Sequence, residues 1–356
     1  ASDWSSDVCS SDLVPQRAGK YGLKVWHGAW LNDNDKENLE QINLLIDHAN
    51  KYKDTVERVI VGNEVLLRKE LTAAQLRSYI RQVKQRVTQP VTYADVWEFW
   101  LRNPRLADDV DFITVHMLPY WEDQPIAVPR ALRHVANVLE IVQSQFPGRK
   151  LFVGEIGWPS LGRMREDARP SPSDQARFLR EFVAVTQSLG VGYNFIEAFD
   201  QNWKRASEGT VGGHWGLYDS QRRPKVELAG PVSDDPAWRR HWLIGIGVGL
   251  LVLIAGVAAH SLGSARPAGR DVKGAWIFAA GFFAGVCGAV LTSQGLYMRD
   301  TALTSMDWAG SLGGTILAVA AAMFAIWALI DRARNLPVRP AVGVGDRKST
   351  RLNSSH

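Results

Sequence analysis

Cysteine is nearly absent from this sequence. Only two of its 356 residues are cysteine, Cys9 and Cys287, and Cys287 lies inside an apolar run. So few cysteines exclude a disulfide framework and a cysteine-based zinc site. The sequence also has no group of histidines and carboxylates at metal-ligand spacing. We therefore expect neither a metal nor another cofactor.

A strong excess of one charge is also missing. The 41 Lys and Arg residues stand against 37 Asp and Glu residues, which gives a net charge of +4. Binding of nucleic acid calls for clustered basic residues in a matching fold, so we expect no nucleic-acid partner. Tryptophan, in contrast, is abundant, with 14 residues. Tryptophan rings stack on sugars, fill cores and lie at membrane interfaces, so their number alone does not indicate a function.

The two ends of the chain match translations of a common sequencing-library adapter. Asp346–His356 (DRKSTRLNSSH) corresponds to one DNA strand and Asp3–Leu13 (DWSSDVCSSDL) to its complement. We interpret residues 1–13 and 346–356 as adapter-derived artefacts and exclude them from the fold. The natural segment is then about Val14 to Gly345, truncated at both ends. The alternative is a polar, disordered tail at each end.

Three long apolar stretches follow the linker at residues 233–241. They cover about residues 242–263, 274–298 and 308–330, each close to the roughly 20 residues that cross a bilayer. We predict a membrane domain over residues 242–335 with three transmembrane helices. The basic residues Arg266, Arg270, Lys273, Arg332, Arg334 and Arg339 lie on one side, and Arg239, Arg240 and Arg299 on the other. This excess places the first group in the cytoplasm and the N-terminal domain outside the membrane.

Residues 14–232 alternate short apolar strands with amphipathic helices. This alternation predicts an α/β fold with a parallel sheet and helices outside it. Six units are visible, so an eight-unit barrel would lack its first two, and we expect such a fragment to be unstable. The predicted strands are Leu23–Trp26, Val59–Val61, Val91–Tyr93, Phe112–Val115, Leu151–Val153 and Tyr193–Ile196. The predicted helices are about Lys36–Tyr52, Ala73–Arg86, Ala127–Gln145 and Ser173–Leu189.

Two of these strands end in a glutamate. Glu64 follows the apolar run that begins at Val59, and Glu155 follows the run that begins at Leu151. The C-terminal strand ends of a (β/α)8 barrel form one mouth, so both carboxyl groups are expected there. Cleavage of a glycosidic bond needs such a pair, a proton donor and a nucleophile or base. Alternatively, each glutamate caps a helix or pairs with an arginine.

The motifs VGNEVLLR, VDFITVHMLPYW and VGEIGWPS resemble glycoside hydrolase family 17, the β-1,3-glucanase family. The resemblance covers about Tyr21 to Val232. The later motifs EAFDQNWK and GTVGGHWGLYD resemble its bacterial membrane-bound branch, which includes β-(1→6)-glucan synthase-type proteins. The resemblance implies a TIM barrel that retains anomeric configuration, with Glu64 as acid/base after the fourth strand and Glu155 as nucleophile after the seventh. The visible strands would then be strands 3 to 8, and the truncated fragment itself would be inactive.

Further polar residues are candidates for substrate binding. The resemblance implies that Asn63 binds a sugar 2-hydroxyl, although it could be a turn residue only. His116 is expected as a hydrogen-bonded residue of the site wall, and Asp95 as a contact at the rim. Glu197 either binds a sugar hydroxyl or pairs with Lys204.

Three aromatic residues complete the candidate site. Tyr120 follows a strand and either orients Glu155 or only packs. Trp158 and Trp203 are candidate platforms for sugar rings, with core filling as the alternative.

These observations favour a membrane-anchored, retaining glycosidase or transglycosidase that remodels or synthesises β-1,3 or β-1,3/1,6 glucan of the cell envelope. The expected partners are β-glucan, the lipid bilayer and a glycosyltransferase domain or subunit. The expected location is the bacterial inner membrane, with the catalytic domain periplasmic. One alternative is an endo-β-1,3-glucanase that hydrolyses glucan. An alternative of another class is a non-catalytic glucan-binding or scaffold component of a polysaccharide synthesis complex.

Overall fold

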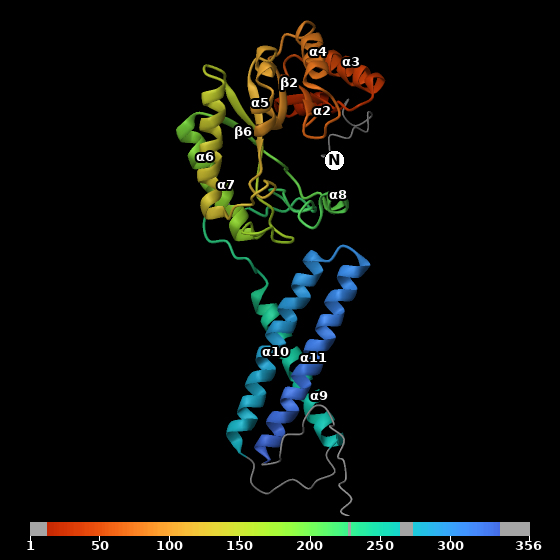
Figure 1. Cartoon of the computed structure of the whole chain (residues 1–356), viewed down its shortest axis with the longest axis vertical. Helices are drawn as coiled ribbons and strands as arrows, with labels where there is room; N and C mark the ends of the chain where they lie inside the picture. Colours follow the sequence, from red (N-terminus) through yellow and green to blue (C-terminus); the bar gives the residue numbers. More distant parts are fainter. Residues whose placement is uncertain (1–12, 227–228, 264–272, 335–356) are drawn as a thin grey trace, which may run out of the picture. The chain divides into compact units, whose positions relative to one another are not determined.

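The computed structural model describes residues 13–226, 229–263 and 273–334 of the chain. The chain divides into two compact units, residues 1–234 and residues 235–356 (Figure 1). The adapter-like ends and the basic residues Arg266, Arg270 and Arg339 lie outside the described residues. Each unit is described separately below.

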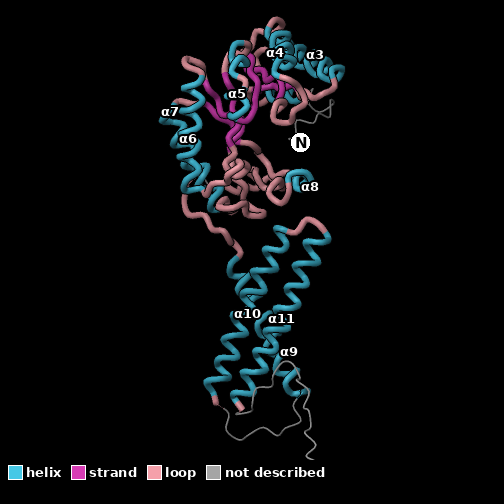
Figure 2. Tube along the Cα trace, in the orientation of Figure 1, coloured by secondary structure: helices cyan, strands magenta, loops and turns pink. Residues whose placement is uncertain are grey.

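The first unit contains a six-stranded parallel sheet (Figure 2). The strands are β1 (Val25–Ala29), β2 (Val56–Asn63), β3 (Val91–Val96), β4 (Ile113–Met117), β5 (Leu151–Ile156) and β6 (Gly192–Phe195). They pair in chain order, so every connection between neighbours is a crossover that carries a helix or a long loop. Within the described residues, β1 and β6 each pair with one strand only and form the edges of the sheet.

The middle of the sheet is buried on both faces. Every residue of β4 is buried, as are the last five residues of β2. Covering both faces explains why these strands read as apolar runs rather than as alternating patterns. At the edge, β6 alternates between exposed and partly buried residues.

Helices occupy the connections, and the sequence marks where they begin. They are α2 (Val14–Lys20), α3 (Asp35–Lys51), α4 (Ala73–Lys84), α5 (Trp97–Arg102), α6 (Val128–Gln145), α7 (Pro172–Leu189) and α8 (Arg205–Glu208), with 3-10 turns at Pro104–Asp108 and Asn202–Lys204. Asn34, Thr72 and Ser171 cap α3, α4 and α7 by accepting hydrogen bonds from backbone N–H groups of the first turn.

The first strand lies further along the chain than the sequence predicted. We expected Leu23–Trp26, but β1 covers Val25–Ala29, and Leu23 is 61% exposed. Gly22 has a positive φ of 69° and ends the turn that follows α2, so the chain enters the sheet only after it. Periodicity does not locate this turn, because Leu23 is as apolar as the strand residues. The short α5 was not predicted.

The second unit is built from α9 (Trp238–Gly263), α10 (Gly274–Thr301) and α11 (Ser305–Ala333). By length and composition, these three helices of the described chain are apolar enough to cross a membrane. Small residues bring α9 and α10 together: a Cβ atom added to Gly249 would lie 2.7 Å from the carbonyl oxygen of Ala284. A polar pair, His260 and Asp331, joins α9 to α11 at 2.8 Å.

Candidate active site

Glu64 lies on a tight turn directly after β2. Gly62 has a φ of 85° and Glu64 a φ of 51°, which is rare for a residue with a side chain. The Glu64 N–H donates to the carbonyl oxygen of Ala94 at 2.8 Å, which ties the turn to β3. Left-handed backbone at a non-glycine residue persists only where its surroundings enforce it, and such residues gather at functional sites.

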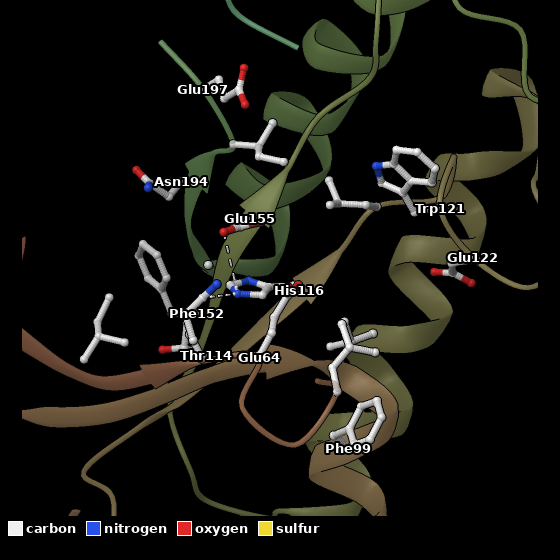
Figure 3. A pocket seen from close by; sticks show the side chains of 18 of the residues that line it. Glu64, Phe99, Thr114, His116, Trp121, Glu122, Phe152, Glu155, Asn194 and Glu197 are labelled. Carbon is white, nitrogen blue, oxygen red and sulfur yellow. Dashed lines mark hydrogen bonds and ion pairs between the residues drawn. The ribbon is translucent and has the colours of Figure 1, made fainter. Parts of the chain in front are cut away.

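Glu155 lies within β5, where it pairs in register with His116 of β4. One carboxylate oxygen of Glu64, one of Glu155 and a ring nitrogen of His116 all lie within 4.8 Å of one another. The His116 Nε2 atom is 3.8 Å from Glu155 Oε1 and 2.8 Å from the Oδ1 atom of Asn63. Figure 3 shows Glu155 and His116 facing each other from neighbouring strands. The structure therefore brings together the two predicted carboxyl groups, with His116 in the wall as expected.

These residues line a cavity of about 770 Å³. Trp121 and Glu122, from the loop after β4, lie along one part of it, and Glu197 and Asn194 along another (Figure 3). A cavity of this size with mixed polar and aromatic walls is typical of a small-molecule or oligosaccharide site.

Burial dominates the electrostatics of the two glutamates. The pKa of Glu64 is raised to about 7, mainly by burial and also by the nearby Glu155 carboxylate, whereas His116 opposes the shift. Burial also raises the pKa of Glu155 to about 7, against the attraction of Lys204. Two neighbouring carboxyl groups with raised pKa values share a single proton near neutral pH, since ionising both would place like charges side by side.

A buried cation lies beside this pair. Lys204 is 5% exposed, donates to Glu197 Oε1 at 2.7 Å and lies 3.8 Å from Glu208. Its charge lowers the pKa of Glu155. Glu197 therefore pairs with Lys204, as one alternative predicted, and it also lines the cavity, while its binding of a sugar hydroxyl stays a prediction. From the sequence, Lys204 was expected only as a partner of Glu197, and its proximity to Glu155 was not predicted.

Arg68 holds the turn that carries Glu64. Its Nη1 atom donates to the carbonyl oxygen of Asn63, its Nη2 atom to that of Leu31 at 2.7 Å, and its Nε atom to Glu70 at 2.8 Å. Its guanidinium also lies 4.1 Å from the centre of the Trp30 ring. The loops after β1 and β2 are thus joined through one side chain.

Two predicted site residues, Asp95 and Tyr120, do not line the cavity. Asp95 is fully buried and accepts hydrogen bonds from the Tyr93 hydroxyl and the Val96 N–H, so it is not the rim contact that we expected. Tyr120 donates from its hydroxyl to the carbonyl oxygen of Arg163 at 2.7 Å. This contact does not orient Glu155, and the packing alternative describes Tyr120.

The predicted tryptophan platforms also lie elsewhere. Trp158 is fully buried and donates from Nε1 to the carbonyl oxygen of Arg169, so it fills the core. Trp203 is 49% exposed but is not among the residues that line the cavity. Trp121 lines the cavity instead and was missed. Its position directly after the Leu-Pro-Tyr segment that leaves β4 was the available signal, together with Glu122 beside it.

Glu64, His116 and Glu155 also have the spacing of a metal site. The sequence showed no such group because the three residues come from different strands. His116 already bonds Asn63 through the nitrogen that faces the carboxyl groups, and the raised pKa values leave one carboxyl group protonated.

Comparison with known proteins assigns the family. The profile of the BtgE/BtgC glycoside hydrolase domain matches residues 4–216, more than half of the chain. The chain belongs to the BtgE/BtgC glycoside hydrolase domain family. The predicted resemblance to a glycoside hydrolase is confirmed at this level.

Relatives of this BtgE/BtgC glycoside hydrolase domain include fungal enzymes. Glucan 1,3-beta-glucosidase of Saccharomyces cerevisiae is 28% identical over 244 residues, which cover 63% of this chain and 78% of the yeast protein. The protein of the same name from Schizosaccharomyces pombe is 30% identical over 233 residues, which cover 61% of this chain and 71% of that protein. Because these relatives are fungal, they lend no support to the resemblance to a bacterial branch.

Solved structures establish the fold of the domain. The glycoside hydrolase family 17 beta-1,3-glucanosyltransferase from Rhizomucor miehei matches with a TM-score of 0.57 and 23% identity, covering 63% of this chain and 84% of that enzyme. An active-site mutant of that enzyme, with the same TM-score, is in complex with laminaritriose. The predicted parallel α/β fold of the barrel type is confirmed, whereas the loss of two strands stays a prediction.

Proposed function

We propose that this chain is a retaining glycosidase or transglycosidase that acts on β-1,3-glucan, with Glu64 as acid/base and Glu155 as nucleophile. The supporting observation is the approach of the two carboxyl groups within 4.8 Å in one cavity. Retaining enzymes hold their two carboxyl groups roughly 5–5.5 Å apart, whereas inverting enzymes leave room for a water molecule between them.

In the first step the ionised Glu155 attacks the anomeric carbon of a bound glucan. The bond from this carbon to the glycosidic oxygen breaks, and its electron pair stays on the oxygen. Glu64 gives its proton to this oxygen, so the leaving sugar departs neutral. The raised pKa of Glu64 suits this role because the group must still hold its proton near neutral pH.

In the second step Glu64, now ionised, takes a proton from an acceptor hydroxyl. The acceptor oxygen attacks the anomeric carbon and displaces Glu155, which restores both carboxyl groups to their first state. Water as acceptor gives hydrolysis, and a sugar hydroxyl gives transfer. Lys204 favours the ionised Glu155 that leaves in this step.

The names of the relatives and the side chains that line the cavity support the proposed substrate class. The fungal relatives are named for 1,3-beta-glucosidase activity, and the Rhizomucor miehei enzyme binds laminaritriose. In this chain the exposed ring of Trp121 offers a face for stacking, and Glu122 and Glu197 offer carboxylates to sugar hydroxyls.

A covalent trapping experiment tests the nucleophile. A 2-deoxy-2-fluoro laminaribioside with a good leaving group should leave its glycosyl unit on Glu155, which peptide mass spectrometry locates. Trapping needs a single turnover, so slow catalysis does not hide the result. The Glu155→Gln variant should take up no label, and Glu140→Gln, an exposed glutamate of α6, should label normally. Label on another residue would refute the assignment, whereas no label at all would agree with the expectation that the truncated chain is inactive.

Product analysis separates transfer from hydrolysis. Incubation with laminari-oligosaccharides of one length should give products longer than the donor if a sugar acts as acceptor. Only shorter products would favour the endo-β-1,3-glucanase alternative. Binding without any product, and without an effect of Glu155→Gln, would favour a glucan-binding scaffold protein instead.

We further propose that α9, α10 and α11 anchor the enzyme in a membrane. Their length and apolar composition support this proposal. The motifs after β6 and the anchor together suggest an envelope protein of a bacterial inner membrane, with β-glucan and a glycosyltransferase domain or subunit as partners. An anchored enzyme is suited to remodelling or synthesis of its own cell's glucan, including β-1,3/1,6 glucan.

A further inference from the structure

Asn63 and His116 form a buried polar pair in the wall of the cavity. Asn63 is 1% exposed and His116 is 2% exposed. The His116 Nε2 atom lies 2.8 Å from Asn63 Oδ1, so a proton must lie between them. The other polar atoms of the two side chains, Asn63 Nδ2 and His116 Nδ1, have no hydrogen-bond partner among the described residues.

Gly154 explains why His116 can occupy this position. A Cβ atom on Gly154 would lie 2.8 Å from His116 Cε1 and 2.9 Å from His116 Nδ1, closer than side chains approach. The same atom would lie 2.6 Å from the methyl group of Thr114. The imidazole ring therefore lies in the space that the missing side chain leaves on β5, next to Glu155. Its Nδ1 edge faces Gly154, and none of the described residues offers it an acceptor.

This packing determines which nitrogen of His116 carries the proton. Burial lowers the pKa of His116, so the ring is neutral and has one N–H group. A proton on Nδ1 would be a buried donor without an acceptor, which is costlier than a buried nitrogen lone pair. A proton on Nε2 is donated to Asn63 Oδ1. In the alternative, the Asn63 amide is flipped and its Nδ2–H group donates to an unprotonated Nε2. The His116 proton would then lie on Nδ1, where it has no acceptor among the described residues.

We propose that Gly154 and His116 are positioning residues that fix the amide of Asn63 with its Nδ2 group free to donate to a sugar hydroxyl. This inference rests on the proposed function, since it assumes a sugar in the cavity beside Glu64 and Glu155. His116 acts through Asn63 and does not itself transfer a proton. Because both hydrogen atoms of Nδ2 lack a partner in the described structure, a bound hydroxyl oxygen would satisfy a donor that is otherwise buried and unpaired.

Nuclear magnetic resonance of the imidazole nitrogens tests the tautomer without any need for activity. The full chain would be labelled with 15N-histidine in detergent micelles, and the signals of His116 identified by their loss in His116→Gln. We expect a neutral ring with the proton on Nε2. In Gly154→Ala these signals should shift or split, because the added methyl group displaces the ring. A proton on Nδ1, or a doubly protonated ring at neutral pH, would overturn the proposal.

Kinetics test the action through Asn63. Asn63→Ala and His116→Phe should each lower kcat about tenfold, the loss of one hydrogen bond in the transition state, with a smaller change in KM. The double variant should be no slower than Asn63→Ala, because His116 has nothing left to position. His116→Gln retains an N–H donor and should recover most of the rate. Melting curves of each variant identify any that fails to fold.

Different results would refute the positioning role of His116 and Gly154 and the catalytic role of Glu64 and Glu155. Losses that multiply in the double variant would refute the positioning role while leaving Glu64 and Glu155 as the catalytic pair. Covalent label on a residue other than Glu155 would refute the proposed function, whatever tautomer His116 has. A normal rate in His116→Phe would refute the positioning role directly.

Discussion

Glu155 is a carboxyl group that the fold holds away from water. Burial raises its pKa, and Lys204 offsets only part of the cost of the charged form. The same holds for Glu64, which burial and the charge of Glu155 keep protonated. This buried pair of carboxyl groups therefore lowers the free energy of unfolding at pH values where both groups tend to ionise.

Replacement of Glu155 by Gln should stabilise the first unit above neutral pH. The folded pair of Glu64 and Glu155 loses its protons only near pH 7, whereas the unfolded chain releases both near the ordinary value of 4.5. Between these values the folded state binds more protons, so the stability of the unchanged chain falls as pH rises. Glu155→Gln removes one carboxyl group from the pair, so only Glu64 keeps this dependence, and the variant should gain about 1–3 kcal/mol by pH 8. Denaturant unfolding at pH 5 and pH 8, followed by tryptophan fluorescence, measures the difference.

The matched control for this prediction is Glu140→Gln, on the exposed face of α6. It removes the same charge without relieving burial, so its stability should follow that of the unchanged chain at both pH values. An equal gain in both variants would mean that net charge, rather than burial of Glu155, is responsible.

Residue roles differed in how far the sequence could predict them. Glu64 and Glu155 were predictable because strand ends converge on one face of a parallel sheet, whatever the details of the loops. Trp158 and Trp121 were not, because an aromatic residue after a strand can turn either into the core or into the cavity. Asp95 was placed at the rim because it lies near the end of its strand, yet the Tyr93 hydroxyl and the Val96 N–H hold it inside.

At the scale of elements, the turn after β2 depends on a neighbouring loop. Arg68 joins the carbonyl oxygens of Asn63 and Leu31, and its side chain is only 19% exposed. The guanidinium fork reaches both carbonyl groups and Glu70 at once, which a lysine ammonium cannot do with the same geometry. We infer that Arg68 maintains the unusual backbone of Glu64.

Arg68→Lys should therefore lower kcat by about tenfold to a hundredfold, with little change in KM, and lower the free energy of unfolding by about 1–3 kcal/mol. The control is Arg81→Lys, because Arg81 is 55% exposed and bonds only Asp109 at 2.7 Å in the described structure. Arg81→Lys should change neither quantity measurably. Unchanged kcat in Arg68→Lys would show that the turn holds Glu64 without this side chain.

In the second unit, the pair of His260 and Asp331 links α9 to α11. Both side chains are buried, and Trp327 packs edge-on against the His260 ring. Polar pairs between apolar helices typically contribute about 0.6 kcal/mol and up to about 1.7 kcal/mol. A double-mutant cycle of His260→Ala and Asp331→Ala in detergent unfolding should give a coupling energy in this range. A coupling energy near zero would mean that close packing of small residues, as at Gly249, holds the helices alone.

Elements were predicted well where one signal dominates. The amphipathic pattern locates α7, although the helix begins at Pro172 with Ser171 as its cap rather than at Ser173, and uninterrupted apolar runs locate α9 to α11. The start of α9 was placed at Trp242, yet the helix begins at Trp238, because Arg239 and Arg240 are helical although they are not apolar. Hydropathy marks the apolar part of a helix and not its hydrogen-bonded end.

At the scale of the whole molecule, the chain combines a unit of the glycoside hydrolase fold with a unit that can cross a membrane three times. If α9 and α10 each cross the membrane as proposed, the segment before α9 and the short connection from α10 to α11 would lie on the same side. In the proposed arrangement, the C-terminal end of α9, the start of α10 and the end of α11 would lie on the other side. The basic residues Lys273, Arg332 and Arg334 belong to this second side, which the positive-inside rule assigns to the cytoplasm.

Labelling of single cysteines tests this arrangement. In a background of Cys9→Ser and Cys287→Ser, Leu303→Cys should react with a membrane-impermeant maleimide added to intact spheroplasts, because Leu303 is 41% exposed between α10 and α11. Lys273→Cys should react only after the membrane is opened, since it precedes α10. The reverse pattern would place the hydrolase unit in the cytoplasm, where it could not reach envelope glucan. Labelling of both Leu303→Cys and Lys273→Cys from outside would mean that α10 does not cross the membrane. Only α9 and α11 would then anchor the chain, and Lys273 would lie on the side opposite to the one that the positive-inside rule predicts.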